Sequence, residues 1–248
     1  MDSRIFNNKE LLFAAFLTIF YLFTGFTPNP LAWPDQVKSR IALTENIEPN
    51  NPQIQQLDLD FEKYYTIELL KNSSLSNPTQ EYEARSIETY IRARIPYVTD
   101  FINYLAWDHY PKISEVLERG DDCDGIVFVG CSLLTRRGFD AYIVYGKWHS
   151  WIEVHLEETG ILTLFDDRLN AFSPWYIKYN TQHVYLNEIS FFELILFNFL
   201  FILALEKIFL TSYFFIRRYE AIQSVYTSIH AFLIPPILVT MILFSLNS

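Results

Sequence analysis

Long runs of apolar residues near both ends of the chain restrict its fold more than any other feature. Residues 11–27 and 225–246 are runs of 17 and 22 residues without a formal charge, and residues 189–216 are largely apolar around Glu206 and Lys207. A helix that crosses a bilayer needs about 17–25 predominantly apolar residues. The sequence therefore predicts three transmembrane helices, at 11–27, 189–216 and 225–246. Part of the second is expected to continue as a cytoplasmic extension.

The first apolar run also admits a second interpretation, as a cleaved signal peptide. It is long for the apolar core of such a peptide. Pro28, Asn29 and Pro30 follow it, and they do not form a small-residue cleavage site. We therefore expect residues 1–10 to be a short N-terminal tail before an uncleaved anchor.

Basic residues beside the apolar runs predict the orientation in the membrane. They precede the first run and separate the second from the third: Arg4, Lys9, Lys207, Arg217 and Arg218. Lysine and arginine are enriched on the cytoplasmic side of membrane helices. Residues 28–188 are then extracytoplasmic, although Lys38 and Arg40, just after the first run, count against this orientation. The chain is expected to be a multi-pass integral membrane protein in contact with lipid.

The charge of the chain lies in the segment between these runs. Its 29 acidic and 19 basic side chains give a net charge of −10, and residues 28–188 hold 24 of the acidic and 14 of the basic ones. An acidic domain is not expected to bind nucleic acid. Two cysteines can form neither a disulfide framework nor a four-cysteine zinc site. No metal or cofactor is expected.

The middle segment divides into a linker and a domain. Residues 28–60 are rich in Pro, Asn and Gln and are predicted to be a linker with little core. Residues 61–188 are predicted to form an α+β domain. Its helices are expected at about 79–94, at 114–118 and from Cys123 to Gly138, and its strands at 141–145, 149–156 and 161–165.

Three residues of this domain suggest cysteine chemistry. Cys123 opens a predicted helix, where the helix dipole favours a thiolate, although the acidic neighbours Asp121, Asp122 and Asp124 would raise its pKa. His149 begins the second predicted strand and Asp166 ends the third. Cysteine, histidine and a carboxylate can supply a nucleophile, its base and the group that orients the base.

Around these residues the sequence resembles the transglutaminase-like superfamily, whose core is the papain-like cysteine-protease fold. The resemblance covers roughly residues 80–170 in order. The similar segments are IPYVTD at 95–100, PKISEVLERGDDCDG at 111–125, LLTRRGFDAYIV at 133–144, HSWIEV at 149–154 and LTLFDD at 162–167. The resemblance implies a papain-like domain with Cys123 as nucleophile, His149 as base and Asp166 as the orienting acid.

It also implies a function: acyl transfer, deamidation or proteolysis at amide bonds of a protein or peptide substrate, through a cysteine thioester. Family members often carry Asp-Pro where this chain has Asp166-Asp167, so Asp167 is the alternative third member. Alternation along the strand favours Asp166. Trp107, Tyr110 and Tyr97 are the candidates for an oxyanion donor.

The alternative is that the domain has this fold but has lost catalysis, and that its function is binding, as a membrane-tethered module.

Overall fold

The structure, a computed structural model of the chain, describes residues 8–71, 78–146, 149–157, 159–166 and 174–218. The chain divides into two compact units. One runs from Phe23 to Leu194, and the other joins Met1–Leu22 to Ile195–Ser248. The candidate site lies in the first unit.

The first unit is built on an antiparallel sheet of five strands. Their order across the sheet is β3-β2-β1-β4-β5. The strands are β1 (Asp140–Gly146), β2 (Ser150–Leu156), β3 (Gly160–Leu164), β4 (Trp175–Tyr179) and β5 (Val184–Leu186). The three predicted strands are confirmed, and they pair with one another as expected. β4 and β5 were not predicted.

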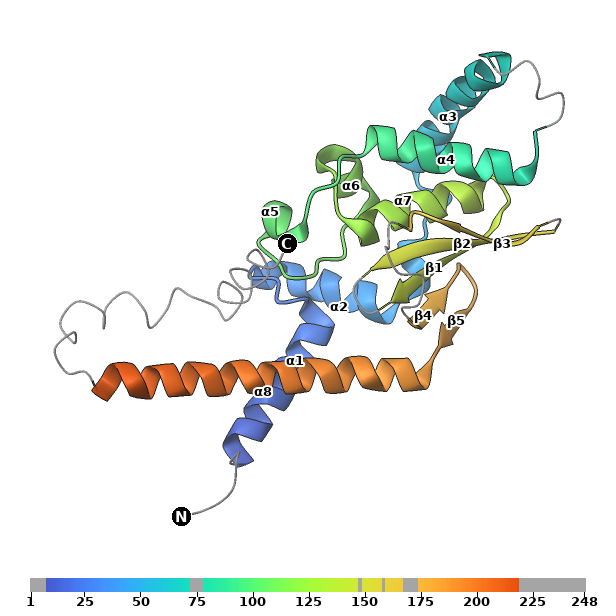
Figure 1. Cartoon of the computed structure of the whole chain (residues 1–248). Helices are drawn as coiled ribbons and strands as arrows, with labels where there is room; N and C mark the ends of the chain where they lie inside the picture. The colour runs from blue at the N-terminus through green and yellow to red at the C-terminus, as the bar shows by residue number, and fades with distance from the viewer. Residues whose placement is uncertain (1–7, 72–77, 147–148, 158, 167–173, 219–248) are drawn as a thin grey trace. The chain divides into compact units, whose positions relative to one another are not determined.

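The helices described between residues 52 and 136 are α3 (Pro52–Lys71), α4 (Gln80–Arg94), α5 (Asp100–Tyr104), α6 (Ile113–Arg119) and α7 (Cys123–Arg136). Of these, α7 packs on the sheet, α4 contacts β3, and α3 and α6 pack against α7. Figure 1 shows α7 lying between α4 and the sheet. The predicted α+β class is therefore confirmed.

Close packing of α7 on the sheet depends on Gly130. A Cβ atom added there would lie 2.9 Å from Cδ1 of Ile152 on β2 and 2.9 Å from the ring of Phe165. The missing side chain lets the backbone of α7 approach β2, and Val127, Cys131 and Leu134 of α7 are fully buried.

The predicted linker at 28–60 is wrong, because this segment is folded. It contains η1 (Pro30–Ala32), α2 (Trp33–Ile41), η2 (Leu43–Asn46) and the start of α3. Leu43, Ile47, Ile54 and Leu57 from this segment belong to the buried core. Burial of these side chains holds the segment against the domain in spite of its polar composition.

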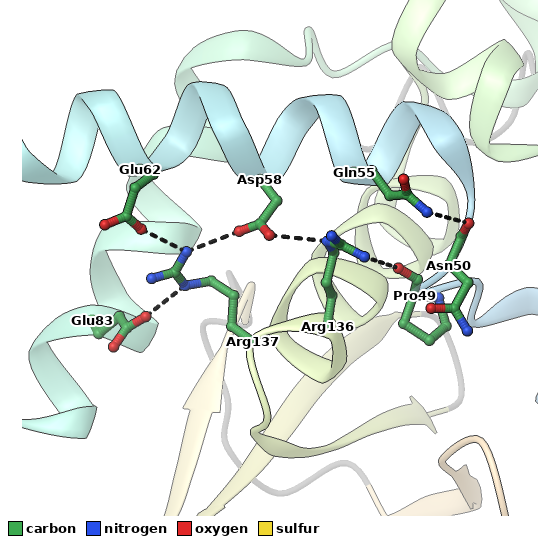
Figure 2. A network of polar contacts seen from close by, with 8 residues as sticks. All are labelled: Pro49, Asn50, Gln55, Asp58, Glu62, Glu83, Arg136 and Arg137. Carbon is green, nitrogen blue, oxygen red and sulfur yellow. Dashed lines mark hydrogen bonds and ion pairs between the residues drawn. The ribbon is translucent and has the colours of Figure 1, made fainter.

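Two arginines fasten the C-terminal end of α7 to the helices outside it. Arg137 donates from Nε to Glu83 of α4 at 2.6 Å, and from Nη1 to Asp58 and Glu62 of α3 at 2.8 and 2.9 Å. Arg136 donates to Asp58 at 2.9 Å (Figure 2). The network connects α3 and α4 to the helix that begins at Cys123.

The second unit contains apolar helices. These are α1 (Asn8–Thr24) as far as Leu22 and the part of α8 (Glu188–Arg218) that begins at Ile195. Within the unit, Lys207 Nζ donates to both carboxylate oxygens of Glu10, at 2.9 and 2.8 Å.

Among the described residues, one helix is long and apolar enough to cross a membrane, at Glu188–Phe209. The predicted number of three such helices is not supported. The helix α1 coincides with much of the first predicted span but has only 17 residues. The predicted span at 225–246 lies outside the described residues.

Candidate functional site

Cys123 is the first residue of α7 and lies against the beginning of β2. Asp122 occupies the N-cap position, with extended backbone angles (φ −87°, ψ −154°). The half-buried Cys123 thiol lies close to the backbone and the side chain of Ser150, and this interaction favours the thiolate. The predicted start of this helix is confirmed.

His149 and Asp166 lie close together at the same end of the sheet. Nε2 of His149 is 3.7 Å from Oδ1 of Asp166, and their side chains are 19% and 18% exposed. This distance allows an ion pair but is longer than a good hydrogen bond. With Nε2 facing Asp166, Nδ1 is the other ring nitrogen able to exchange a proton.

A turn, rather than strand alternation, brings Asp166 to this position. β3 ends at Leu164, and Phe165 has a left-handed backbone with φ 59°. Phe165 N–H donates to Glu88 Oε1 at 2.6 Å, and its side chain is buried. The alternation of side chains ends with β3 at Leu164, two residues before Asp166. It therefore does not explain the position of Asp166. Asp167, the alternative, lies outside the described residues.

The two contacts meet at consecutive residues, because His149 directly precedes Ser150. Cys123 contacts Ser150, and Asp166 contacts His149. Consecutive Cα atoms are about 3.8 Å apart. The start of β2 thus brings together residues from α7, from the chain before β2 and from the chain after β3. Sequence reasoning did not identify Ser150.

The electrostatic surroundings of Cys123 favour the neutral thiol. Burial, followed by the negative charge of Asp122, raises the pKa of Cys123 to about 12, and Asp108 acts in the same direction. The interaction with Ser150 opposes this shift. Of the three acidic neighbours expected to raise this pKa, Asp122 does so, although burial is the larger cause.

Four carboxylates gather next to Cys123. One oxygen each from Asp100, Asp121, Asp122 and Asp124 lies within 4.8 Å of the others. Burial and Asp122 raise the pKa of Asp100 to about 10 and that of Asp121 to about 8. Burial also raises the pKa of Asp124 well above its usual value.

Asp100 joins this group through a contact between separate loops. Tyr97 forms an isolated β-bridge with Asp121, in which Val98 N–H donates to the Asp121 carbonyl at 3.1 Å. This bridge brings the chain that leads into α5 beside the start of α7. No spacing pattern in the sequence predicts that Asp100 lies there.

Among the candidates for an oxyanion donor, Tyr97 interacts electrostatically with Cys123, although the residue is 64% exposed. The pKa of Tyr97 is raised by burial and then by Cys123. Tyr110 instead stacks on Tyr145, and the guanidinium of Arg40 lies 4.0 Å from its ring centroid. The backbone N–H of Trp107 donates to Gly25.

Comparison of the chain with protein-family models, with curated proteins and with solved structures finds no match.

Proposed function

We propose that this protein is a membrane-anchored thiol enzyme of transglutaminase-like type, acting on amide bonds of a protein or peptide substrate. Cys123 is the nucleophile, His149 the base and Asp166 the orienting acid. The observation that carries the proposal is the approach of Asp166 to His149, beside the residue that contacts the Cys123 sulfur.

The reaction requires a proton to leave the thiol. His149 Nδ1 would accept it, while Asp166 holds Nε2 and stabilises the imidazolium that forms. The Cys123 sulfur would then attack the carbonyl carbon of the substrate amide. The tetrahedral intermediate would collapse to a thioester, and the departing ammonia or amine would take its proton from His149.

A second acyl acceptor completes the cycle. Water or a primary amine would attack the thioester, with His149 now removing a proton from the acceptor, and the Cys123 thiol would be regenerated. Water gives deamidation or proteolysis, and an amine gives transamidation. The backbone N–H of Cys123 and the Tyr97 hydroxyl are the proposed donors to the oxyanion.

The proposed membrane arrangement has three spans, with residues 28–188 outside. The ion pair between Glu10 and Lys207 supports part of it. Glu10 lies near the start of α1, and Lys207 lies near the end of the apolar stretch Glu188–Phe209. The proposed arrangement has Glu10 and Lys207 at the same, cytoplasmic, side of the membrane, and their pairing agrees with this.

Labelling of an introduced cysteine tests this orientation. Gln56 is exposed on α3, and Gln56→Cys in a Cys123→Ser background would react with a membrane-impermeant maleimide applied to intact cells. Labelling only after the cells are opened would place the domain in the cytoplasm and overturn the orientation.

The raised pKa of Cys123 supports a second candidate function, a membrane-tethered binding module in which catalysis has been lost. A protonated, half-buried cysteine is a poor nucleophile. The two candidates differ in the reactivity of Cys123 toward an electrophile and in its dependence on His149.

Turnover tests the enzymatic proposal. The detergent-solubilised full chain would be incubated with casein, with and without a fluorescent primary amine. Ammonia release, amine incorporation and peptide cleavage would each be followed. Activity that disappears in Cys123→Ala and persists in Cys131→Ala supports the proposal, because Cys131 is buried in the core. Activity that survives in Cys123→Ala would contradict it.

A further inference from the structure

The four carboxylates beside α7 have the spacing of ligands around one cation. One oxygen from each of Asp100, Asp121, Asp122 and Asp124 lies within 4.8 Å of the other three. Oxygen ligands lie about 2.3–2.6 Å from Ca²⁺, so two ligands of one ion are at most about 5 Å apart. The separations of the four oxygens therefore meet the distance requirement for ligands of a single ion.

Two glycines allow the carboxylates to approach so closely. A Cβ atom at Gly125 would lie 2.0 Å from Oδ2 of Asp121 and 2.7 Å from its Cβ and Cγ, so the Asp121 side chain occupies the space that a larger residue would fill. Gly120 has φ +77°, and a Cβ atom there would lie 2.3 Å from the carbonyl oxygen of Pro96. Gly120 thus permits the contact between the loops that hold Asp100 and Asp121.

Burial of these side chains is the second, independent observation. Asp121, Asp100 and Asp124 are only 0%, 3% and 4% exposed. Oδ1 of Asp100 and Oδ2 of Asp124 are buried without a hydrogen bond from any residue that the structure describes. Buried carboxylate oxygens are normally hydrogen-bonded, paired with a cation or bound to a metal.

The nearby positive charge is too small to balance four carboxylates. Arg40 interacts electrostatically with Asp124, but its guanidinium is already bound to Asp108 at 2.8 Å and to Gln36 at 3.2 Å. The N-terminus of α7 adds only about half a unit charge. A divalent cation would supply the missing charge and the missing partners together.

We propose that Asp100, Asp121, Asp122 and Asp124 form a Ca²⁺ site at the N-terminus of α7. An all-carboxylate set of ligands favours a hard cation. Mg²⁺ usually keeps several waters and uses one or two carboxylates, whereas Ca²⁺ accepts many protein oxygens in flexible geometry. The site stands on these contacts alone and does not depend on the proposed catalysis.

Equilibrium dialysis with radioactive Ca²⁺ tests the site directly. The full chain in detergent, first treated with EDTA, should bind a single Ca²⁺, with Mg²⁺ competing at least about tenfold less well. The double variant Asp121→Asn/Asp124→Asn keeps the shape of both side chains and should weaken binding at least about tenfold. Asp140→Asn, the same change at the start of β1, should bind as the parent does.

Thermal unfolding provides a second measurement. Ca²⁺ should raise the unfolding midpoint of the parent and of Asp140→Asn, because an ion that binds only the folded state stabilises it. Without Ca²⁺ the double variant should be at least as stable as the parent, since repulsion between carboxylates is reduced. Adding Ca²⁺ should not raise its midpoint.

A single variant keeps the test decisive should the double variant not fold. Asp122 is half-buried, so Asp122→Asn disturbs the core less, and it too should weaken Ca²⁺ binding. Absence of binding to the parent at 10 mM Ca²⁺ would overturn the site. Undiminished binding to folded Asp122→Asn or to the folded double variant would also overturn it.

Discussion

Nε2 of His149 lies 3.7 Å from Oδ1 of Asp166, although one residue precedes β2 and the other follows β3. The pairing of β2 with β3 brings these strand ends together, and the turn at Phe165 sets the position of the carboxylate. The same strand end holds Ser150 against Cys123. Sheet register and helix packing therefore determine the candidate site jointly.

Substitution of the three proposed catalytic residues should reduce turnover unequally. Cys123→Ala and His149→Ala should each lower kcat by about 10⁴-fold or more, because they remove the nucleophile or its base. The loss of kcat in Asp166→Ala should be about 100-fold smaller, because Asp166 orients the base but forms no bond to the substrate. Steady-state kinetics of the purified variants checks the order. A larger loss in Asp167→Ala than in Asp166→Ala would keep the mechanism and reassign the third residue.

The arginine network at the end of α7 should contribute measurably to stability. Arg137→Ala breaks three hydrogen bonds to carboxylates from a side chain that is only 18% exposed. We expect the free energy of unfolding to fall by about 2–3 kcal/mol. Denaturant titration of the full chain in detergent, followed by intrinsic fluorescence, measures the change.

Arg85→Ala is the matched control for Arg137→Ala. Arg85 pairs with Glu81 within α4 and its side chain is 54% exposed. Such a pair contributes about 0.5 kcal/mol or less. Equal losses in the two variants would show that the network does not hold α3 and α4 against α7.

His109 should make the domain less stable in mild acid. Burial, followed by the charge of Arg40, lowers the pKa of His109 to about 4, below its ordinary value of about 6.5. Above pH 6.5 the imidazole is neutral in both states and its contribution is fully present. As the pH falls from about 6.5 to 4, the unfolded chain gains a proton that the folded chain does not. Stability should decrease by at most about 1.4 kcal/mol per pH unit.

Comparison of variants isolates this effect from the nearby carboxylates. His109→Gln should flatten the slope of unfolding free energy against pH between 4 and 6.5, whatever it costs in stacking on Tyr104. The slope of the parent chain under the same conditions is the reference. An unaltered slope in His109→Gln would mean that His109 takes up its proton at the same pH in the folded and the unfolded chain.

Local sequence patterns predicted the central part of the fold. Alternation at Ile152, Val154 and Leu156 identified β2. The caps of α4, Thr79 and Ile95, lie close to the predicted ends of that helix. These elements bury one regular face each, so their periodicity is visible without knowledge of the tertiary structure.

The folded segment at 28–60 was missed because its polar composition outweighed a weaker signal. Ile54, Leu57, Phe61 and Tyr65 stand at helical spacing along α3 and are all buried. Their pattern crosses the boundary placed at residue 61, and proline and asparagine before it suggested a linker. The average composition of residues 28–60 is polar, and it concealed the helical spacing of the apolar residues in α3.

The acidic cluster could not be predicted from spacing, because its parts come from separate loops. Asp121, Asp122 and Asp124 are adjacent in sequence, but Asp100 reaches them only through the bridge between Tyr97 and Asp121. Such a bridge depends on tertiary contacts and on the left-handed backbone of Gly120.

The rate of alkylation of Cys123 by iodoacetamide tests the central claim most directly, because it requires no knowledge of the substrate. Labelling of the full chain in detergent at pH 7 would be followed by mass spectrometry, with buried Cys131 as an internal control. The proposed enzyme predicts alkylation of Cys123 faster than that of a free thiol, and a rate at least about tenfold lower in His149→Ala. Alkylation no faster than that of a free thiol, and equal in the parent and His149→Ala, would contradict it.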